Sequence, residues 1–345
     1  MLLINKSNCS QIIKNPTNIF PIVIYQNMAF NSDIISGFKF WKLFEKFNIE
    51  IFKNKNSIAF FRSFALGDIL QLIPVVRLIK IKYNIKTVAI VTLMNIIKEL
   101  QESFRDILFY TESRFMNFTD VISFNLDGIL EKDHNPNNLE SNKHRVDIYL
   151  NAMGIENYNR NFNWNPTNLP KELNIVMSTN RKKIGLQIKG STDIKSLPIA
   201  FVRKLAIELA EKYEIYLIHH NNNCEIQGKN IINTCGKFSV SENIALLTKL
   251  DCCITMDSGV LWMAHVANCP VLTILGPTRE SERLTLHPQY PQKAKSINIA
   301  EELVGCKPCF ETKQYCKGKI NCMRNFDYDN LIKLIKIKIN EILGE

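Results

Sequence analysis

No apolar run in the chain approaches the roughly 20 residues that a membrane-spanning helix needs. The opening stretch, MLLINKSNCSQIIKNPTNIF, lacks a basic start followed by an apolar block and a small-residue cleavage site. No Arg-rich run, and no basic stretch interleaved with aromatic residues of the RNA-binding type, is present. These absences argue against an integral membrane protein, a secreted protein and a nucleic-acid partner, and we expect a cytoplasmic protein.

The composition is that of a folded protein large enough for two domains. The chain has 345 residues, of which 46% are hydrophobic and 22% charged. Its formal net charge of +10 favours anionic partners such as nucleic acid, anionic lipid or phosphorylated metabolites. The same charge could simply reflect a proteome rich in Lys, Asn and Ile.

Strand-like and helix-like segments alternate along most of the chain, which predicts parallel βαβ units. The predicted strands are 57–63, 87–92, 120–126, 183–189, 215–220, 252–256 and 270–276. The predicted helices are 67–83, interrupted by Pro74, then 96–104, 144–155, 199–213, 239–250, 258–268 and 328–343. Ser239 and Glu242 are spaced as in a capping box at the start of one of them.

The alternation predicts two similar α/β halves. The Asn- and Pro-rich stretch 159–183 has no clean period and reads as the connection between them. Residues 1–56 fit the pattern poorly and are interpreted as an extension, either an extra strand–helix unit or a lid. The predicted parts are the extension 1–56, a first domain 57–165, a second domain 175–325 and a final helix 326–345.

Two predicted strand ends carry Gly beside Asp, in FALGDIL (64–70) and MDSGVLW (256–262). Ligands of open α/β sheets bind beyond such strand ends, and a helix N-terminus there offers amide groups to a diphosphate. Ser258 and Gly259 could bind the diphosphate, while Asp257 would suit a ribose hydroxyl pair. Each motif alone is a weak signal, and a helix cap is its simpler interpretation, because Asp and Ser are preferred at that position.

Four segments in order resemble those of glycosyltransferase family 9, the lipopolysaccharide heptosyltransferase family. They are FRSFALGDILQLIPVVRLIK, GSTDIKSLP, MDSGVLWMAHVANCPVLTILGPT and CKPCFETKQYCKGKINCMRN. The resemblance covers about residues 57–340 and implies a GT-B fold. In that fold two Rossmann-like domains face each other across a cleft, with the acceptor site mainly on the first, the nucleotide-sugar site mainly on the second, and a C-terminal helix crossing back.

The resemblance also implies roles for particular residues. Asp68 matches the general base that takes a proton from the acceptor hydroxyl, and Lys195 matches the cleft lysine that stabilises the departing nucleoside diphosphate. Lys195 could instead be a solvated surface lysine. Gly67 and Arg62 are expected on the acceptor side. The donor-binding residues are expected to be Ser191, Thr192, Asp257, Ser258, Gly259 and Thr278.

The sequence departs from the family at several positions near the donor pocket. Leu197 and Ile199 stand where the family has Trp and Glu, and Trp262 stands where it has His. His265, one turn further, could substitute, although a buried structural histidine is the simpler interpretation. ADP-heptose, the donor of the best-known members, could therefore be replaced by another nucleotide sugar. We identify no Asp-x-Asp pair of the type that holds Mg²⁺ in other glycosyltransferases, so catalysis is expected to need no cofactor.

The chain has ten cysteines, and four of them are clustered near its end. A tetrathiolate site for structural zinc or iron, two disulfides, and reduced thiols in a packed loop are the alternatives. Four thiolate ligands would leave no open position for catalysis. The cluster consists of Cys306, Cys309, Cys316 and Cys322; the scattered cysteines in apolar runs are expected to be buried.

The sequence thus predicts an inverting glycosyltransferase that moves a heptose-like sugar from a nucleotide sugar to a lipopolysaccharide-core or other surface glycan. An anionic glycolipid or glycan is the expected acceptor, with peripheral contact at the inner membrane. The alternatives are a protein O-glycosyltransferase of the same family and an inactive GT-B scaffold. The final helix carries Lys333, Lys336 and Lys338 and could lie on anionic membrane, although we expect it to pack against the first domain.

Overall fold

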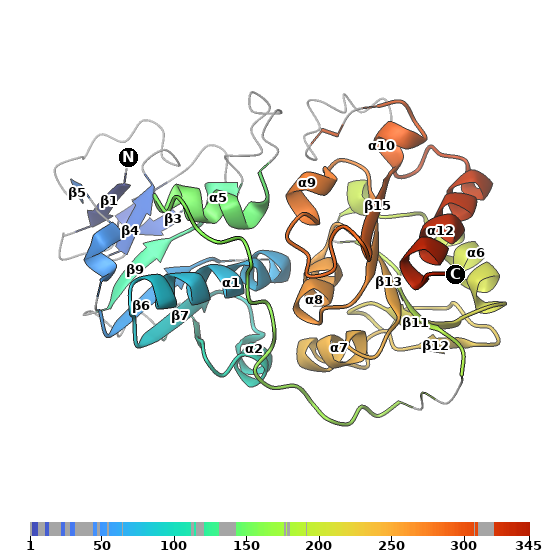
Figure 1. The fold of residues 1–345 in the computed structure, drawn as a ribbon, viewed down its shortest axis with the longest axis horizontal. Coiled ribbons are helices and arrows are strands. Elements are labelled where there is room, and N and C mark those ends of the chain that lie inside the picture. The colour runs from blue at the N-terminus through green and yellow to red at the C-terminus, as the bar shows by residue number, and fades with distance from the viewer. Residues whose placement is uncertain are drawn as a thin grey trace. The chain divides into compact units, whose positions relative to one another are not determined.

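A computed structural model of the chain divides into two compact units, residues 1–163 and 164–345 (Figure 1). Each unit is built on its own sheet. The structure describes residues 2–5, 11–13, 22–24, 28–31, 44–46, 49–53, 55–63, 65–111, 114, 121–130, 143–175, 177, 180–190, 192–306, 308–309 and 321–345.

The sheet of the first unit contains seven described strands. They pair in the order β5 (Phe44–Lys46), β1 (Leu2–Asn5), β4 (Met28–Asn31), β9 (Ile122–Asn125), β6 (Ser57–Phe61), β7 (Thr87–Thr92) and β8 (Leu108–Thr111). The pairs from β4 to β8 are parallel, whereas β1 pairs antiparallel with both β4 and β5. A separate antiparallel ribbon joins β2 (Gln11–Ile13) to β3 (Ile22–Ile24).

The N-terminal residues were expected to form a strand–helix unit or a lid. Instead, β1, β4 and β5 extend the sheet of the first unit, and a short 3₁₀ helix, η3 (Ile49–Phe52), follows them. These strands are only three or four residues long. Segments this short show too few alternations of apolar and polar residues for a periodic pattern to stand out.

The strand order of the first unit places a topological switch point between β6 and β9. From β6 the chain runs outward through β7 to β8 and then returns to the other side of β6 as β9. Ligands of open α/β sheets bind at such a point, beyond the carboxyl ends of the strands. The loops after β6 and β9 are therefore the place to look for functional side chains in this unit.

Helices of the first unit lie close to their predicted positions. Those whose bounds the structure describes are α1 (Leu66–Lys82), α2 (Ile97–Ser103) and α5 (Arg145–Ala152). The predicted interruption at Pro74 is wrong, because α1 continues through it. The proline removes one backbone hydrogen bond of the helix. The helix is nevertheless buried on all sides at this point, since Pro74 and its neighbours Ile73 and Val75 are buried, the latter two at 0% exposure. Tertiary packing thus outweighs the local preference.

The second unit has a fully parallel sheet of six described strands. They pair in the order β12 (Ile231–Asn233), β11 (Glu214–Ile218), β10 (Lys183–Gln187), β13 (Cys252–Met256), β14 (Val271–Leu275) and β15 (Ala294–Asn298). Numbered within the unit, this is 3-2-1-4-5-6, the strand order of dinucleotide-binding Rossmann folds. The switch point lies between β10 and β13.

Helices cover both faces of this sheet, with α7 and α8 on one face and α6 and α12 on the other (Figure 1). The capping box predicted for Ser239 and Glu242 is confirmed at the start of α7. The described helices are η5 (Asp193–Lys195), α6 (Ile199–Ala210), α7 (Val240–Leu247), α8 (Gly259–Val266), α9 (Glu280–Arg283), α10 (Ile299–Glu302) and α12 (Tyr328–Leu343).

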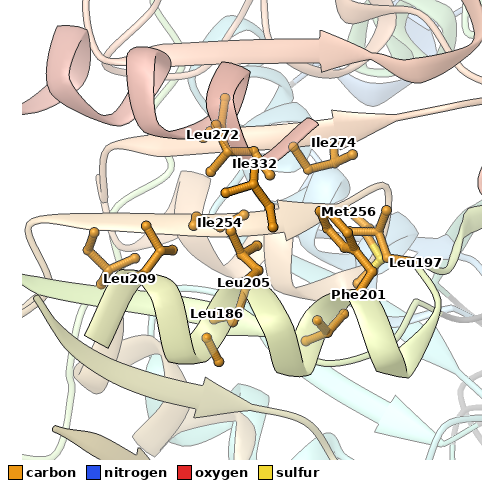
Figure 2. Close-up of a cluster of buried hydrophobic side chains, with 14 of the residues drawn as sticks. Leu186, Leu197, Phe201, Leu205, Leu209, Ile254, Met256, Leu272, Ile274 and Ile332 are labelled. Carbon is orange, nitrogen blue, oxygen red and sulfur yellow. The ribbon is translucent and has the colours of Figure 1, made fainter. Parts of the chain in front are cut away.

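The last helix buries its apolar face in the core of the second unit, not against the first domain as expected. Figure 2 shows side chains of α6, of β13 and β14, and Ile332 of α12 meeting in this core. Burying each such side chain is worth about 1.5–3 kcal/mol. The buried residues of α12 are Leu331, Ile332, Ile335, Ile339 and Ile342, each at most 3% exposed. Within the described part of the chain, no helix is both long and apolar enough to cross a membrane.

Candidate functional site

The loops after β10 and β13 meet at the switch point of the second unit, and Gln187 ties them together. Its Oε1 atom accepts hydrogen bonds from Thr255 Oγ1 at 2.6 Å, from the backbone N of Met256 at 2.9 Å and from Ser258 Oγ at 2.9 Å. Gln187 ends β10 and is buried. One side chain therefore fixes the end of β13 relative to β10.

Ser258 and Gly259 form the start of α8, as the sequence predicts. Ser258 is the N-cap, and its Oγ accepts a hydrogen bond from the backbone N of Val260 at 3.2 Å. Together with the bond to Gln187, this engages the hydroxyl in building the turn. The backbone amides of the first turn of α8 are the groups that remain suited to an anion.

Asp257 lies at the same point, between two cations of the chain. Arg283 binds it through both oxygens, with Nε–Oδ1 at 2.7 Å and Nη2–Oδ2 at 3.0 Å. The Nζ atom of Lys195 lies 3.2 Å from Oδ2. Glu282 adds a fourth charge, with Oε2 at 3.1 Å from Arg283 Nη1. Lys195 and Asp257, predicted separately, are in direct contact, whereas Arg283 was missed.

The other predicted donor residues do not join this cluster in the described contacts. Thr192 is exposed, and its carbonyl accepts a hydrogen bond from Ser196 Oγ at 2.6 Å. Thr278 is buried, and its carbonyl accepts from Asn298 Nδ2 at 3.0 Å. Ser191 lies outside the described residues. The donor roles of these three residues stay predictions.

An aromatic cluster packs against α8. Trp262 stacks on Trp164, with 6.2 Å between ring centroids, and His265 lies 4.7 Å from Trp262 and 4.4 Å from His287. Burial lowers the pKa of His265 from 6.5 to about 4 and that of His287 well below its usual value. The interpretation of His265 as a buried structural histidine is confirmed by its 0% exposure.

In the first unit, Asp68 is likewise held between two cations. Arg62 contacts Asp68 Oδ2 through Nη2, and Arg145 Nη1 lies 2.8 Å from Oδ1. Gln71, one turn further along α1, donates to the carbonyl of Gly67 at 2.8 Å and lies 3.4 Å from Asp68 Oδ1. The three side chains fix the orientation of a carboxylate that is only 7% exposed.

Asp127 completes this cluster from the end of β9. It accepts hydrogen bonds from the backbone N of Ser63 at 2.9 Å and from the Ser63 hydroxyl, and Oδ1 lies 3.6 Å from Arg62 Nη1. Sequence reasoning missed both Asp127 and Arg145. The signal for Asp127 was present, because it follows a predicted strand and precedes a glycine, Gly128. Arg145 carries no comparable local signal.

The cysteine cluster is described only in part. Cys306 and Cys309 are half-buried, Cys322 is buried, and Cys316 lies outside the described residues. No group of three or more His, Cys, Asp or Glu side chains that could hold a metal is found in the parts of the chain that the structure describes. The scattered cysteines Cys224, Cys235, Cys252, Cys253 and Cys269 are buried, as expected.

One Asp-x-Asp pair does occur in the chain, at the start of α12. Asp327 caps this helix by accepting hydrogen bonds from the backbone N of Asp329 at 2.8 Å and of Asn330 at 3.1 Å. Asp329 pairs with Lys204 of α6. Asp327 therefore caps α12, and Asp329 joins α12 to α6.

Comparison with known proteins identifies the family. Among curated proteins, no sequence match is found. Similar solved structures include a glycosyl transferase family 9 protein from Veillonella parvula (TM-score 0.56, 14% identity, covering 83% of this chain and 97% of that one). The iron-containing dodecameric glycosyltransferase TibC from enterotoxigenic E. coli is also similar (0.60, 12%, 99% and 95%), as is E. coli ADP-heptose LPS heptosyltransferase II (0.53, 13%, 82% and 98%).

These likenesses support the two-domain GT-B fold. The sequence model of glycosyltransferase family 9 (heptosyltransferase) matches residues 142–320, which is more than half of the chain. The matched region contains the Lys195–Asp257 pair, the start of α8 and three of the four clustered cysteines. The chain therefore belongs to glycosyltransferase family 9.

Proposed function

We propose that this protein is an inverting glycosyltransferase that transfers a heptose-like sugar from a nucleotide sugar to a hydroxyl group of an anionic acceptor. The observation that carries the proposal is the placement of Lys195 and the start of α8 together at the Rossmann switch point of a family 9 chain. Nucleotides bind at this point in folds of this strand order.

The donor diphosphate would bind between Lys195 and the first turn of α8. Lys195 contacts Asp257, and Asp257 immediately precedes the N-cap Ser258, so the ammonium lies beside the helix start. Both groups favour negative charge, and that charge grows on the diphosphate as it leaves. ADP-heptose is the donor we propose, because TibC has been solved in complex with ADP-D-β-D-heptose.

Asp68 would act as the base. The acceptor hydroxyl attacks the anomeric carbon from the side opposite the diphosphate, and its proton passes to Asp68 as the new C–O bond forms. The bond to the diphosphate breaks, so the nucleoside diphosphate leaves and the configuration inverts. Arg62 and Arg145 favour the ionised carboxylate that a base requires. General base catalysis typically contributes about 10²–10⁴-fold to the rate.

A basic pocket in the first unit supports an anionic acceptor. It has a volume of about 780 Å³ and includes Asn95 and Thr111, which lie at the carboxyl ends of β7 and β8. These strands run parallel to β6, so this part of the lining lies at the same end of the sheet as Asp68, whereas Arg105 and Leu108 lie at the opposite end of β8. Its charged lining residues are Lys98, Arg105 and Arg114 against Glu102, an excess of positive charge. Phosphate or carboxylate groups of a glycan would suit it.

A structural metal fits the chemistry of the cysteine cluster. The similar protein TibC contains iron, and four thiolates form a tetrahedral donor set for iron or zinc. Cys306, Cys309, Cys316 and Cys322 would hold the ion. With four protein ligands no position remains open to substrate, so the metal would stabilise the loop before α12 and take no part in transfer.

A thermal-shift screen against ADP-, GDP-, UDP- and CDP-linked sugars tests the proposal. Stabilisation by one nucleotide class is expected, because a ligand that binds only the folded state raises the melting temperature. The shift should disappear in Lys195→Met and persist in Lys204→Met, a matched change of an exposed lysine on α6. If no nucleotide sugar shifts the wild-type protein, transfer is refuted and an inactive GT-B scaffold remains.

A further inference from the structure

The carboxylate of Asp257 is occupied by the chain's own cations. Oδ1 accepts a hydrogen bond from Arg283 Nε, and Oδ2 accepts one from Arg283 Nη2. Oδ2 also forms an ion pair with Lys195 Nζ at 3.2 Å. The side chain of Asp257 is only 6% exposed. A ribose would have to compete with two full charges for these oxygens. Asp257 is thus better suited to hold its neighbours than to bind the sugar of a nucleotide.

Arg283 is the fixed member of this group. Its side chain is 0% exposed, and Glu282 contacts its remaining terminal nitrogen at 3.1 Å. The planar guanidinium meets Asp257 through two parallel bonds, a geometry that fixes the carboxylate in orientation as well as in position. The residue follows the Gly-Pro-Thr turn after β14, on the short helix α9, so it is anchored to the same sheet.

Lys195 is the adaptable member. A lysine ammonium is a point charge on a flexible four-carbon stem, and by itself it has no preferred position. Here it lies 3.2 Å from Asp257 Oδ2, and its side chain is 11% exposed, so it borders on solvent. Asp257 can therefore hold the ammonium in place at the border of the site.

We propose that Arg283 is a positioning residue for the transfer reaction, acting through Asp257 on Lys195. This inference rests on the proposed function. Arg283 fixes Asp257, and Asp257 holds the Lys195 ammonium where the leaving diphosphate gathers charge. Preorganised charges are effective because they need not move during the reaction, and a displacement of 1 Å can cost about 100-fold in rate.

The charges of the group are balanced. Asp257 and Glu282 carry two negative charges, and Arg283 and Lys195 carry two positive ones. Loss of Arg283 would remove the guanidinium that contacts both Asp257 and Glu282, and these four side chains would change from balanced charge to a net negative charge. A substitution that removes the charge of Arg283 should therefore weaken binding of the nucleotide sugar. A substitution that keeps the charge but loses the two parallel bonds to Asp257 should mainly lower kcat.

The experiment separates geometry from charge with Arg283→Lys, which keeps the charge but cannot form two parallel bonds. We expect kcat to fall by about 100-fold with the KM for the nucleotide sugar changed by less than about threefold. Asp257→Asn, which also breaks the ion pair with Lys195, should show the same fall. Arg203→Lys, a change on the exposed face of α6, serves as the matched control.

A double-mutant cycle with Lys195→Met then tests the route. If Arg283 acts through Lys195, Arg283→Lys should change kcat/KM, which can be measured without saturating donor, by less than about twofold in the Lys195→Met background. An equal loss in both backgrounds would overturn the inference, as would unchanged kcat with only a lowered melting temperature. Both of these outcomes require an active wild-type protein. If the proposed function itself is wrong, the wild-type protein transfers no sugar, so the two failures can be told apart.

Discussion

Acid should destabilise the second unit through His265. The side chain is fully buried, and its pKa is lowered from 6.5 to about 4, mainly because burial penalises the charged imidazolium. Between pH 6.5 and about pH 4, His265 is therefore protonated in the unfolded chain but neutral in the folded unit. The free energy of unfolding should fall as the pH falls from about 6.5 to about 4 and be independent of this group at higher pH.

The magnitude follows from the two pKa values. Each pH unit between 6.5 and about 4 corresponds to about 1.36 kcal/mol. His265 alone should cost about 3 kcal/mol of unfolding free energy on going from pH 8 to pH 4. His287, whose pKa is also lowered by burial, should add to the loss in the same direction.

Tryptophan fluorescence can follow this unit alone. Two of the three tryptophans, Trp164 and Trp262, form the stack beside His265, and Trp41→Phe removes the third. Urea unfolding at pH 8, 6, 5 and 4 is the assay. His265→Phe should reduce the fall in free energy by about 3 kcal/mol, whereas the exposed His220→Gln should leave it unchanged. An equally steep fall in His265→Phe would refute the reasoning.

Three further changes test other parts of the molecule. Asp68→Asn should lower kcat by about 10²–10⁴-fold and also lower the melting temperature, because it removes the carboxylate charge that Arg62 and Arg145 contact; retention of activity would exclude it as the base. Gly276→Ala would place a Cβ atom 2.6 Å from Met323 Sδ and 3.0 Å from Cys322 Sγ, so we expect a loss of about 1–3 kcal/mol in urea unfolding; no loss would mean that this packing can adapt. Elemental analysis of purified protein should find one iron or zinc ion per chain, absent in Cys306→Ser, and a metal-free wild type would refute the metal site.

Most of the fold was readable from the sequence because buried parallel strands are continuous apolar runs. The segments 87–92 and 252–256 coincide with β7 and β13, and the last helix was predicted at its observed bounds. The short strands of residues 1–56 escaped, since three or four residues carry little periodicity. The prediction that α12 packs against the first domain was also wrong, because the apolar stripe of a helix does not specify which surface it covers.

For the site, the sequence by itself determined which residue types stand at strand ends. Asp68, Asp257 and Ser258 could be singled out because a strand, a turn and a helix start are local in the chain. The partners of the two carboxylates were decided only by the tertiary structure. Arg145 lies 77 positions from Asp68 and Arg283 lies 26 from Asp257. Strand order brings them together, and no local pattern encodes a contact across such a separation.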